Sequence, residues 1–167
     1  MLPSLYIELY GLCLIPERQY GGNMSKPLIP TKLYKDITNL LYNEGLIKVI
    51  PPQKWTTNDR VYGYLKTQTW LNIRTNKVTE KYVGVYINKN ACPCTLMNFI
   101  EDPKGAIRDF FELVDTICHE LAHMTYHDHS QSHKDLTNKY KDLFYEKYDL
   151  MSAPDQVVDY LIDCKEA

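Results

Sequence analysis

The sequence predicts an α+β protein in which a small, mostly antiparallel or mixed sheet packs on one long amphipathic helix, with further helices toward the C-terminus. Two observations carry this prediction. Between residues 46 and 90, short apolar runs alternate with polar and turn residues, which is typical of neighbouring strands. Residues 31–45 and 106–164 instead repeat apolar side chains at intervals of three and four, the spacing of helices.

The chain divides at about residue 30. Prolines and glycines interrupt residues 1–30 repeatedly, which predicts an irregular N-terminal arm with one short strand within residues 5–15. The rest, residues 31–167, is long enough for one domain with a hydrophobic core of its own. We therefore expect an arm followed by a single domain.

The first regular elements are a helix and a run of strands. Residues 31–45 read as a helix with Thr31 as N-cap and Gly45 at its C-terminal stop. Residues 46–50, the sequence LIKVI, read as a strand, and one or two more are expected in the stretch RVYGYLKTQTWLNIRTN. The clearest strand is KVTEKYVGVYINKN, in which Val83, Val85 and Ile87 alternate with Tyr82, Gly84 and Tyr86 on the opposite face.

Three helices are expected after the sheet. The stretch AIRDFFELVDTICHELAHMTYH is amphipathic over more than five turns, DHSQSHKDLTNKYKDLFYEKY resumes the same spacing, and APDQVVDYLIDC has Pro154 near its start. The first of these helices carries histidines on its second half. That placement makes it the helix of chemical interest.

All five histidines of the chain fall within residues 119–133. His119 and His123 belong to an HExxH motif, and their spacing places both imidazoles one turn apart on one face of a helix. Glu120 follows His119 directly, so its carboxylate is expected near the side of a shared ion that the two histidines leave open. The pattern predicts one bound zinc ion, with Glu120 as general base and not as a ligand.

A third zinc ligand has three candidates. His127 is carried another turn along a rigid helix, away from an ion held by the first two histidines. His129 reaches the ion if the helix stops and the chain turns near residues 126–128. His133 reaches it only if the next helix approaches at a different angle, so we favour His129 over His133 as the third ligand.

The run TICHELAHM, followed by Asp128-His129-Ser130 and Leu136, resembles the active-site block of small zincin-like metallopeptidases, the WLM, SprT-like and YgjP-like group. The resemblance implies His119, His123 and His129 as zinc ligands and Glu120 as the catalytic base. It also implies a zincin-like core. One departure is His133, which stands where the group has an aromatic residue.

The function that follows is a zinc-dependent metallopeptidase, in which Glu120 takes a proton from a zinc-activated water that attacks a peptide bond. Its partner is a protein or peptide substrate, paired along the strand KYVGVYIN. By family analogy alone, that substrate includes DNA-associated proteins. The alternatives are a non-catalytic zinc-stabilised binding module, which a fourth ligand from His133 would favour, and a zinc hydrolase of a non-peptide bond.

Composition and charge indicate which partners and which cellular location to expect. A net charge of -2 gives no whole-protein field for wrapping nucleic acid or lying on an anionic membrane. We expect an intracellular protein, cytoplasmic or nuclear, because no basic leader or membrane span is recognised and the five cysteines lack the spacing of a disulfide scaffold.

Cys92 and Cys94 read as a tight turn in preference to a second zinc site. Asp115 and Asp128 are candidates to orient a metal-bound imidazole, and Tyr126 or His127 to stabilise an oxyanion.

Overall fold

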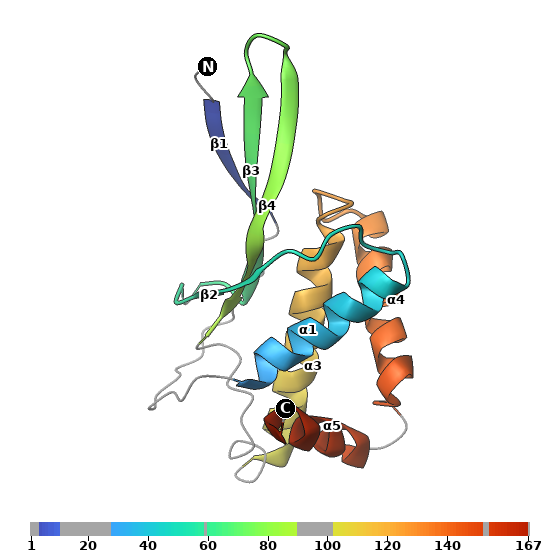
Figure 1. Ribbon diagram of the computed structural model, residues 1–167. Coiled ribbons are helices and arrows are strands. Elements are labelled where there is room, and N and C mark those ends of the chain that lie inside the picture. Colours follow the sequence, from blue (N-terminus) through green and yellow to red (C-terminus); the bar gives the residue numbers. More distant parts are fainter. Residues whose placement is uncertain (1–3, 11–27, 59, 90–101, 152–153, 167) are drawn as a thin grey trace.

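The computed structural model describes residues 4–10, 28–58, 60–89, 102–151 and 154–166. Within these ranges the chain is an α+β protein with one mixed four-stranded sheet and four helices. Figure 1 shows the helices gathered to one side of the sheet, with the hairpin of its two long strands extending past them. The coarse fold class predicted from the sequence is therefore confirmed.

Helix α1 spans Leu28–Asn43 and buries Leu33, Ile37 and Leu41, which follow one another at intervals of four. Gly45 ends it as expected, with a φ of +70° that a residue with a side chain adopts at a cost. The predicted N-cap was wrong, because the helix begins three residues before Thr31. The hydroxyl of that threonine donates instead to the side chain of Gln53.

The segment after α1 contains the second correction. Residues 46–50 do not form a strand. The backbone N–H groups of Leu46 and Ile47 donate to the carbonyl of Leu41, so this segment completes the C-terminal end of α1, and Ile47 is buried beneath it. The strand of this region, β2, lies further along at Gln53–Thr56.

The sheet has the order β1-β3-β4-β2. β1 (Ser4–Tyr10) and β4 (Lys77–Asn88) both pair antiparallel with β3 (Gly63–Asn72), whereas β2 pairs parallel with β4. A strand was expected within residues 5–15, and β1 supplies it. The second half of the proposed substrate edge KYVGVYIN is not free, because β3 pairs with one side of residues 85–87 and β2 with the other.

A bulge in β4 changes which side chains share a face. Leu65 pairs with Val85 and Thr67 pairs with Tyr82, so Val83 has no partner on β3. Leu65 and Thr67 are two residues apart on β3, so their side chains lie on one face of the sheet. Their partners Val85 and Tyr82 therefore share that face, whereas the sequence placed them on opposite faces. The Tyr82 hydroxyl accordingly donates to the carbonyl of Met124, at the end of the helix that the sheet covers.

Three helices follow the sheet: α3 (Pro103–Ala122), α4 (Gln131–Tyr148) and α5 (Pro154–Glu166). Asp102 caps α3 by accepting from the Gly105 N–H, and Ser130 caps α4. The core that joins these helices is strongly aromatic, and its rings are those of Phe110, Phe111, Phe144, Tyr145, Tyr148 and Tyr160. This packing joins the first half of α3, through Phe110 and Phe111, to α4 and α5.

β3 and α3 come unusually close at Gly63. A Cβ atom added there would lie 2.7 Å from the carbonyl oxygen of Tyr86 and 2.9 Å from the Cγ2 atom of Thr116. A side chain would therefore push the strand away from the helix. The absence of one lets the backbone of β3 reach the next residues along α3, which include Glu120.

Candidate metal centre

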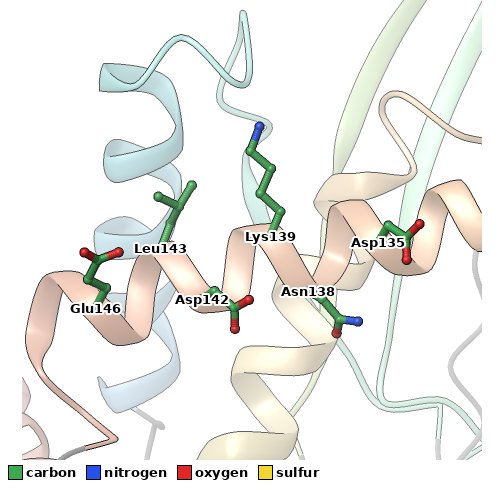
Figure 2. A pocket seen from close by; sticks show the side chains of 6 residues that line it. All are labelled: Asp135, Asn138, Lys139, Asp142, Leu143 and Glu146. Atoms are coloured by element: carbon green, nitrogen blue, oxygen red, sulfur yellow. The ribbon is translucent and has the colours of Figure 1, made fainter.

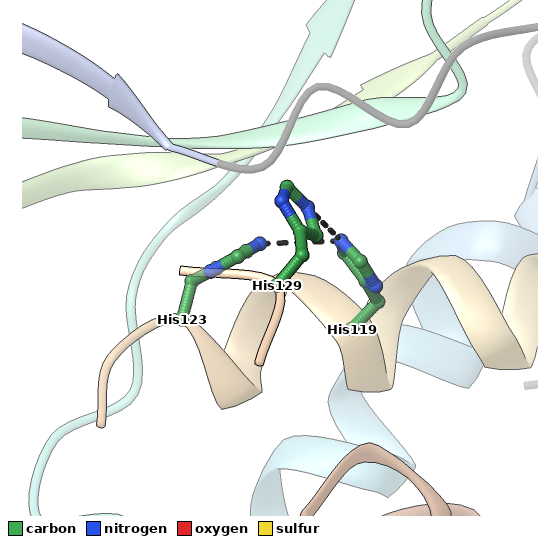
Figure 3. Close-up of side chains that lie close together, drawn as sticks. All are labelled: His119, His123 and His129. Carbon is green, nitrogen blue, oxygen red and sulfur yellow. Dashed lines mark hydrogen bonds between the residues drawn. The ribbon is translucent and has the colours of Figure 1, made fainter. Parts of the chain in front are cut away.

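Helix α3 ends at the last residues of its HExxH motif. Its last helical residue is Ala122, with His123 as C-cap, so the helix stops earlier than the turn expected at residues 126–128. The chain then turns through seven residues before α4 begins and brings His129 back over the helix end. Figure 3 shows the rings of His119, His123 and His129 converging from these two segments.

The three imidazoles present their Nε2 atoms to one point. The Nε2 atom of His119 lies 3.2 Å from that of His123 and 3.2 Å from that of His129, and the ligand atoms of all three lie within 4.8 Å of one another. Tetrahedral zinc with Zn–N distances of 2.0 to 2.1 Å requires nitrogen atoms roughly 3.3 Å apart. The two 3.2 Å separations match this spacing, so the three imidazoles could hold a metal ion of this kind.

His123 is held in the correct tautomer by the turn that follows it. Its Nδ1 atom lies 2.9 Å from the carbonyl oxygen of Tyr126. A carbonyl only accepts, so Nδ1 carries the proton and Nε2 keeps its lone pair for a metal. Tyr126 thus contributes through its backbone carbonyl, and its side chain is exposed.

The surroundings keep the rings of His119 and His123 neutral. The pKa of His119 is lowered to about 3, mainly by burial and then by the neighbouring imidazoles of His133 and His123. The pKa of His123 is lowered to about 4, again mainly by burial. Metal ligation requires an unprotonated imidazole, so both residues are ready to bind at neutral pH.

Glu120 lies in the interior of the protein, between α3 and β3. Its side chain is fully buried, and its Oε2 atom accepts a hydrogen bond of 2.9 Å from the Leu65 N–H. The other oxygen, Oε1, is buried and has no hydrogen-bond partner among the described residues. Burial raises the pKa of Glu120 well above its ordinary value, and the bond from Leu65 opposes that rise in part.

His133 does not join the converging nitrogens. It is fully buried at the start of α4, and its Nε2 atom lies 3.0 Å from the carbonyl oxygen of His119. Its ring stacks on that of His123 with centroids 4.1 Å apart. His133 therefore packs behind the candidate ligands.

Other residues selected from the sequence have different partners. Asp115 forms an ion pair of 2.8 Å with Lys141, and Asp128 accepts from the Ser130 N–H in the turn before α4. No contact of either carboxylate with a ring of the triad is found among the described residues. His127 is exposed beyond the end of α3 and is not one of the three clustered histidines.

A concave surface patch also lies along α4, and none of the three clustered histidines lines it. Figure 2 shows its lining, which comes from this one helix: Asp135, Asn138, Lys139, Asp142, Leu143 and Glu146. Glu146 lies 13 residues after His133, roughly 20 Å along a helix, so it cannot complete the site. The patch reads as a solvated helix face.

The cysteines contribute no ligand in the described part of the chain. Cys118 and Cys164 are buried free thiols, and burial raises the pKa of both. Cys13, Cys92 and Cys94 lie outside the described residues, so the turn expected at Cys92 and Cys94 stays a prediction.

Comparisons of the chain with protein-family models, with curated proteins and with solved structures find no match. None of the described helices has the length and hydropathy needed to cross a lipid bilayer. Fold and site together define an α+β protein with a histidine triad able to hold a metal ion.

Proposed function

We propose that the protein is a zinc-dependent metallopeptidase of the zincin-like kind, with His119, His123 and His129 as ligands and Glu120 as general base. The observation that carries the proposal is the convergence of three histidine Nε2 atoms at the end of the helix that carries Glu120. Glu120 and His123 are three residues apart, which makes them neighbours on the helix surface.

Three imidazoles leave one position of a tetrahedral ion open, and that open position distinguishes catalytic from structural zinc sites. A zinc ion held there would polarise a substrate carbonyl and lower the pKa of an attacking water to about 7. Glu120 would take the proton of that water through Oε1 and pass it to the leaving amine. Its Oε2 atom stays bound to Leu65 and keeps the carboxylate in place.

A second candidate is a non-catalytic metal clamp. It is favoured by the complete burial of Glu120 and by its hydrogen bond to the β3 backbone, because both suit a carboxyl group that joins helix to sheet. In this case the ion would tie the loop that carries His129 to the end of α3. No substrate would be turned over.

One experiment separates the two candidates. Metal content and cleavage of an unstructured protein are measured for the zinc-loaded wild type, Glu120→Gln and Glu120→Asp, with and without single-stranded DNA. The peptidase proposal expects the Gln variant to retain zinc and lose about 10²- to 10⁴-fold in rate. Equal rates in wild type and the Gln variant would refute the role of Glu120. A zinc-loaded protein that cleaves nothing would favour the clamp, and an ester substrate tests hydrolysis of a non-peptide bond.

A further inference from the structure

We infer that His133 is a positioning residue that holds the end of α3 in the shape needed by the three candidate ligands while its own imidazole stays outside the coordination sphere. The inference rests on the metal site proposed above but not on peptidase activity. It concerns a residue that the sequence offered as a possible ligand and that stands where the resembling group has an aromatic residue.

The backbone of His133 is fixed on both sides. Its N–H donates to the hydroxyl of the N-cap residue Ser130, and its carbonyl accepts from the hydroxyl of Thr137, one turn further along α4. The side chain is fully buried. His133 therefore projects from a well-defined point at the start of α4 toward the end of α3.

The side chain of His133 adds a hydrogen bond to the last turn of α3. The carbonyls of Leu121 and Ala122 in that turn accept from N–H groups of the following loop. His119 O accepts a long bond of 3.3 Å from the His123 N–H, and the Nε2 atom of His133 supplies a second, shorter bond of 3.0 Å. This hydrogen bond fixes the backbone of one candidate ligand from the side of α4.

Two candidate ligands also pack directly against the His133 ring. The ring of His123 stacks on it at 26° with centroids 4.1 Å apart, and the ring of His119 meets it edge-on at 79° and 4.4 Å. Close packing limits the rotation of both side chains. The hydrogen bond and the ring contacts together make His133 a support for the orientation of these two rings.

The same hydrogen bond keeps His133 from acting as a ligand. The carbonyl of His119 can only accept, so the Nε2 atom of His133 carries a proton and has no lone pair for a metal. Its Nδ1 atom is buried, has no hydrogen-bond partner among the described residues and is not among the converging ligand atoms. A bound metal ion would therefore have three histidine ligands, His119, His123 and His129, and would keep one position open.

Two substitutions distinguish the effect of the N–H donor of His133 from the effect of its aromatic ring. His133→Gln keeps an N–H donor of similar reach and loses the ring, whereas His133→Phe keeps an aromatic ring and loses the donor. Tyr34→Phe is the matched control, since it removes a buried side-chain donor to the carbonyl of Pro51, away from the site. The full chain is loaded with Zn²⁺ for affinity by chelator competition and with Co²⁺ for its visible absorption spectrum.

We expect the zinc affinity of His133→Phe to fall about 10-fold or more, as for other residues that support metal ligands. His133→Gln should lose less, and Tyr34→Phe should match the wild type. The Co²⁺ spectrum should show the same coordination number in all four proteins. Loss of a nitrogen ligand in either His133 variant would show that His133 binds the ion.

Wild-type affinity in both His133 variants would show that neither the donor nor the ring has a positioning role and would overturn the inference. A wild-type protein that binds no metal would instead overturn the proposed metal site. The two failures are therefore distinguishable.

Discussion

Acid should destabilise the metal-free protein through its buried histidines. The pKa values of His119 and His123 are about 3 and about 4 in the folded protein, against 6.5 for an unperturbed histidine. Between pH 7 and pH 5 the unfolded chain therefore binds a proton at each position and the folded protein does not. Stability that is complete above pH 6.5 is lost as the pH falls toward these folded values.

The size of the loss follows from these pKa values. Moving from pH 7 to pH 5 should lower the free energy of unfolding by about 2 kcal/mol for each of the two histidines, about 4 kcal/mol together. His133 acts in the same direction because its pKa is also lowered. Glu120 acts in the opposite direction: its raised pKa makes the folded protein take up the proton first as the pH falls.

Urea unfolding of the chelator-treated protein at the two pH values measures this effect. His123→Asn keeps a donor for the Tyr126 carbonyl and removes one titrating ring, so it should lose about 2 kcal/mol less than the wild type on acidification. Glu120→Gln removes the opposing group and should lose more. His127→Asn, which changes an exposed histidine of the same segment, is the control. An equal loss in wild type and His123→Asn would refute the burial argument.

Three further results are expected. Gly63→Ala should destabilise the protein by about 1 to 3 kcal/mol in urea unfolding, because the new methyl group meets the Tyr86 carbonyl and the Thr116 methyl. Adding Thr116→Ser to this variant removes one of the two contacts and should restore only part of the lost stability. Gly45→Ala should cost about 1 to 2 kcal/mol through its φ of +70° although space is free around it, and a loss near zero would contradict the strain. Zinc at 100 times its Kd should raise the Tm of the wild type by about 5 to 10 °C, and an equal rise in His129→Ala would contradict the ligand set.

The local features of the fold could be predicted because they depend on neighbouring residues. The spacing of Leu33, Ile37 and Leu41 defines α1, and Gly45 marks its end. Residues 46–50 misled the prediction because a run of apolar residues suits a strand as well as a helix cap that buries one of them, Ile47. The bulge at Val83 has no signal of its own, since it depends on the register between two strands.

The candidate site divides in the same way. Its histidine triad could be predicted because the three residues lie close in sequence and a helix end sets their geometry. The partner of Glu120 could not, because it is a backbone N–H on β3 and any residue at position 65 except proline offers the same group. The hydrogen bond of His133 also escaped prediction, since it depends on how α4 approaches α3.

The sequence distance between the parts of the site has a consequence for the order in which they assemble. His119 and His129 are separated by 10 residues, whereas Leu65 and Glu120 are separated by 55. Closing the longer loop costs about 1.5 kcal/mol more chain entropy. The three imidazoles can therefore gather around a metal in a chain whose sheet has not yet formed, and Glu120 takes its place only when β3 docks on α3. A partly unfolded protein could therefore keep a bound metal after the Glu120 carboxylate has separated from the Leu65 N–H of β3.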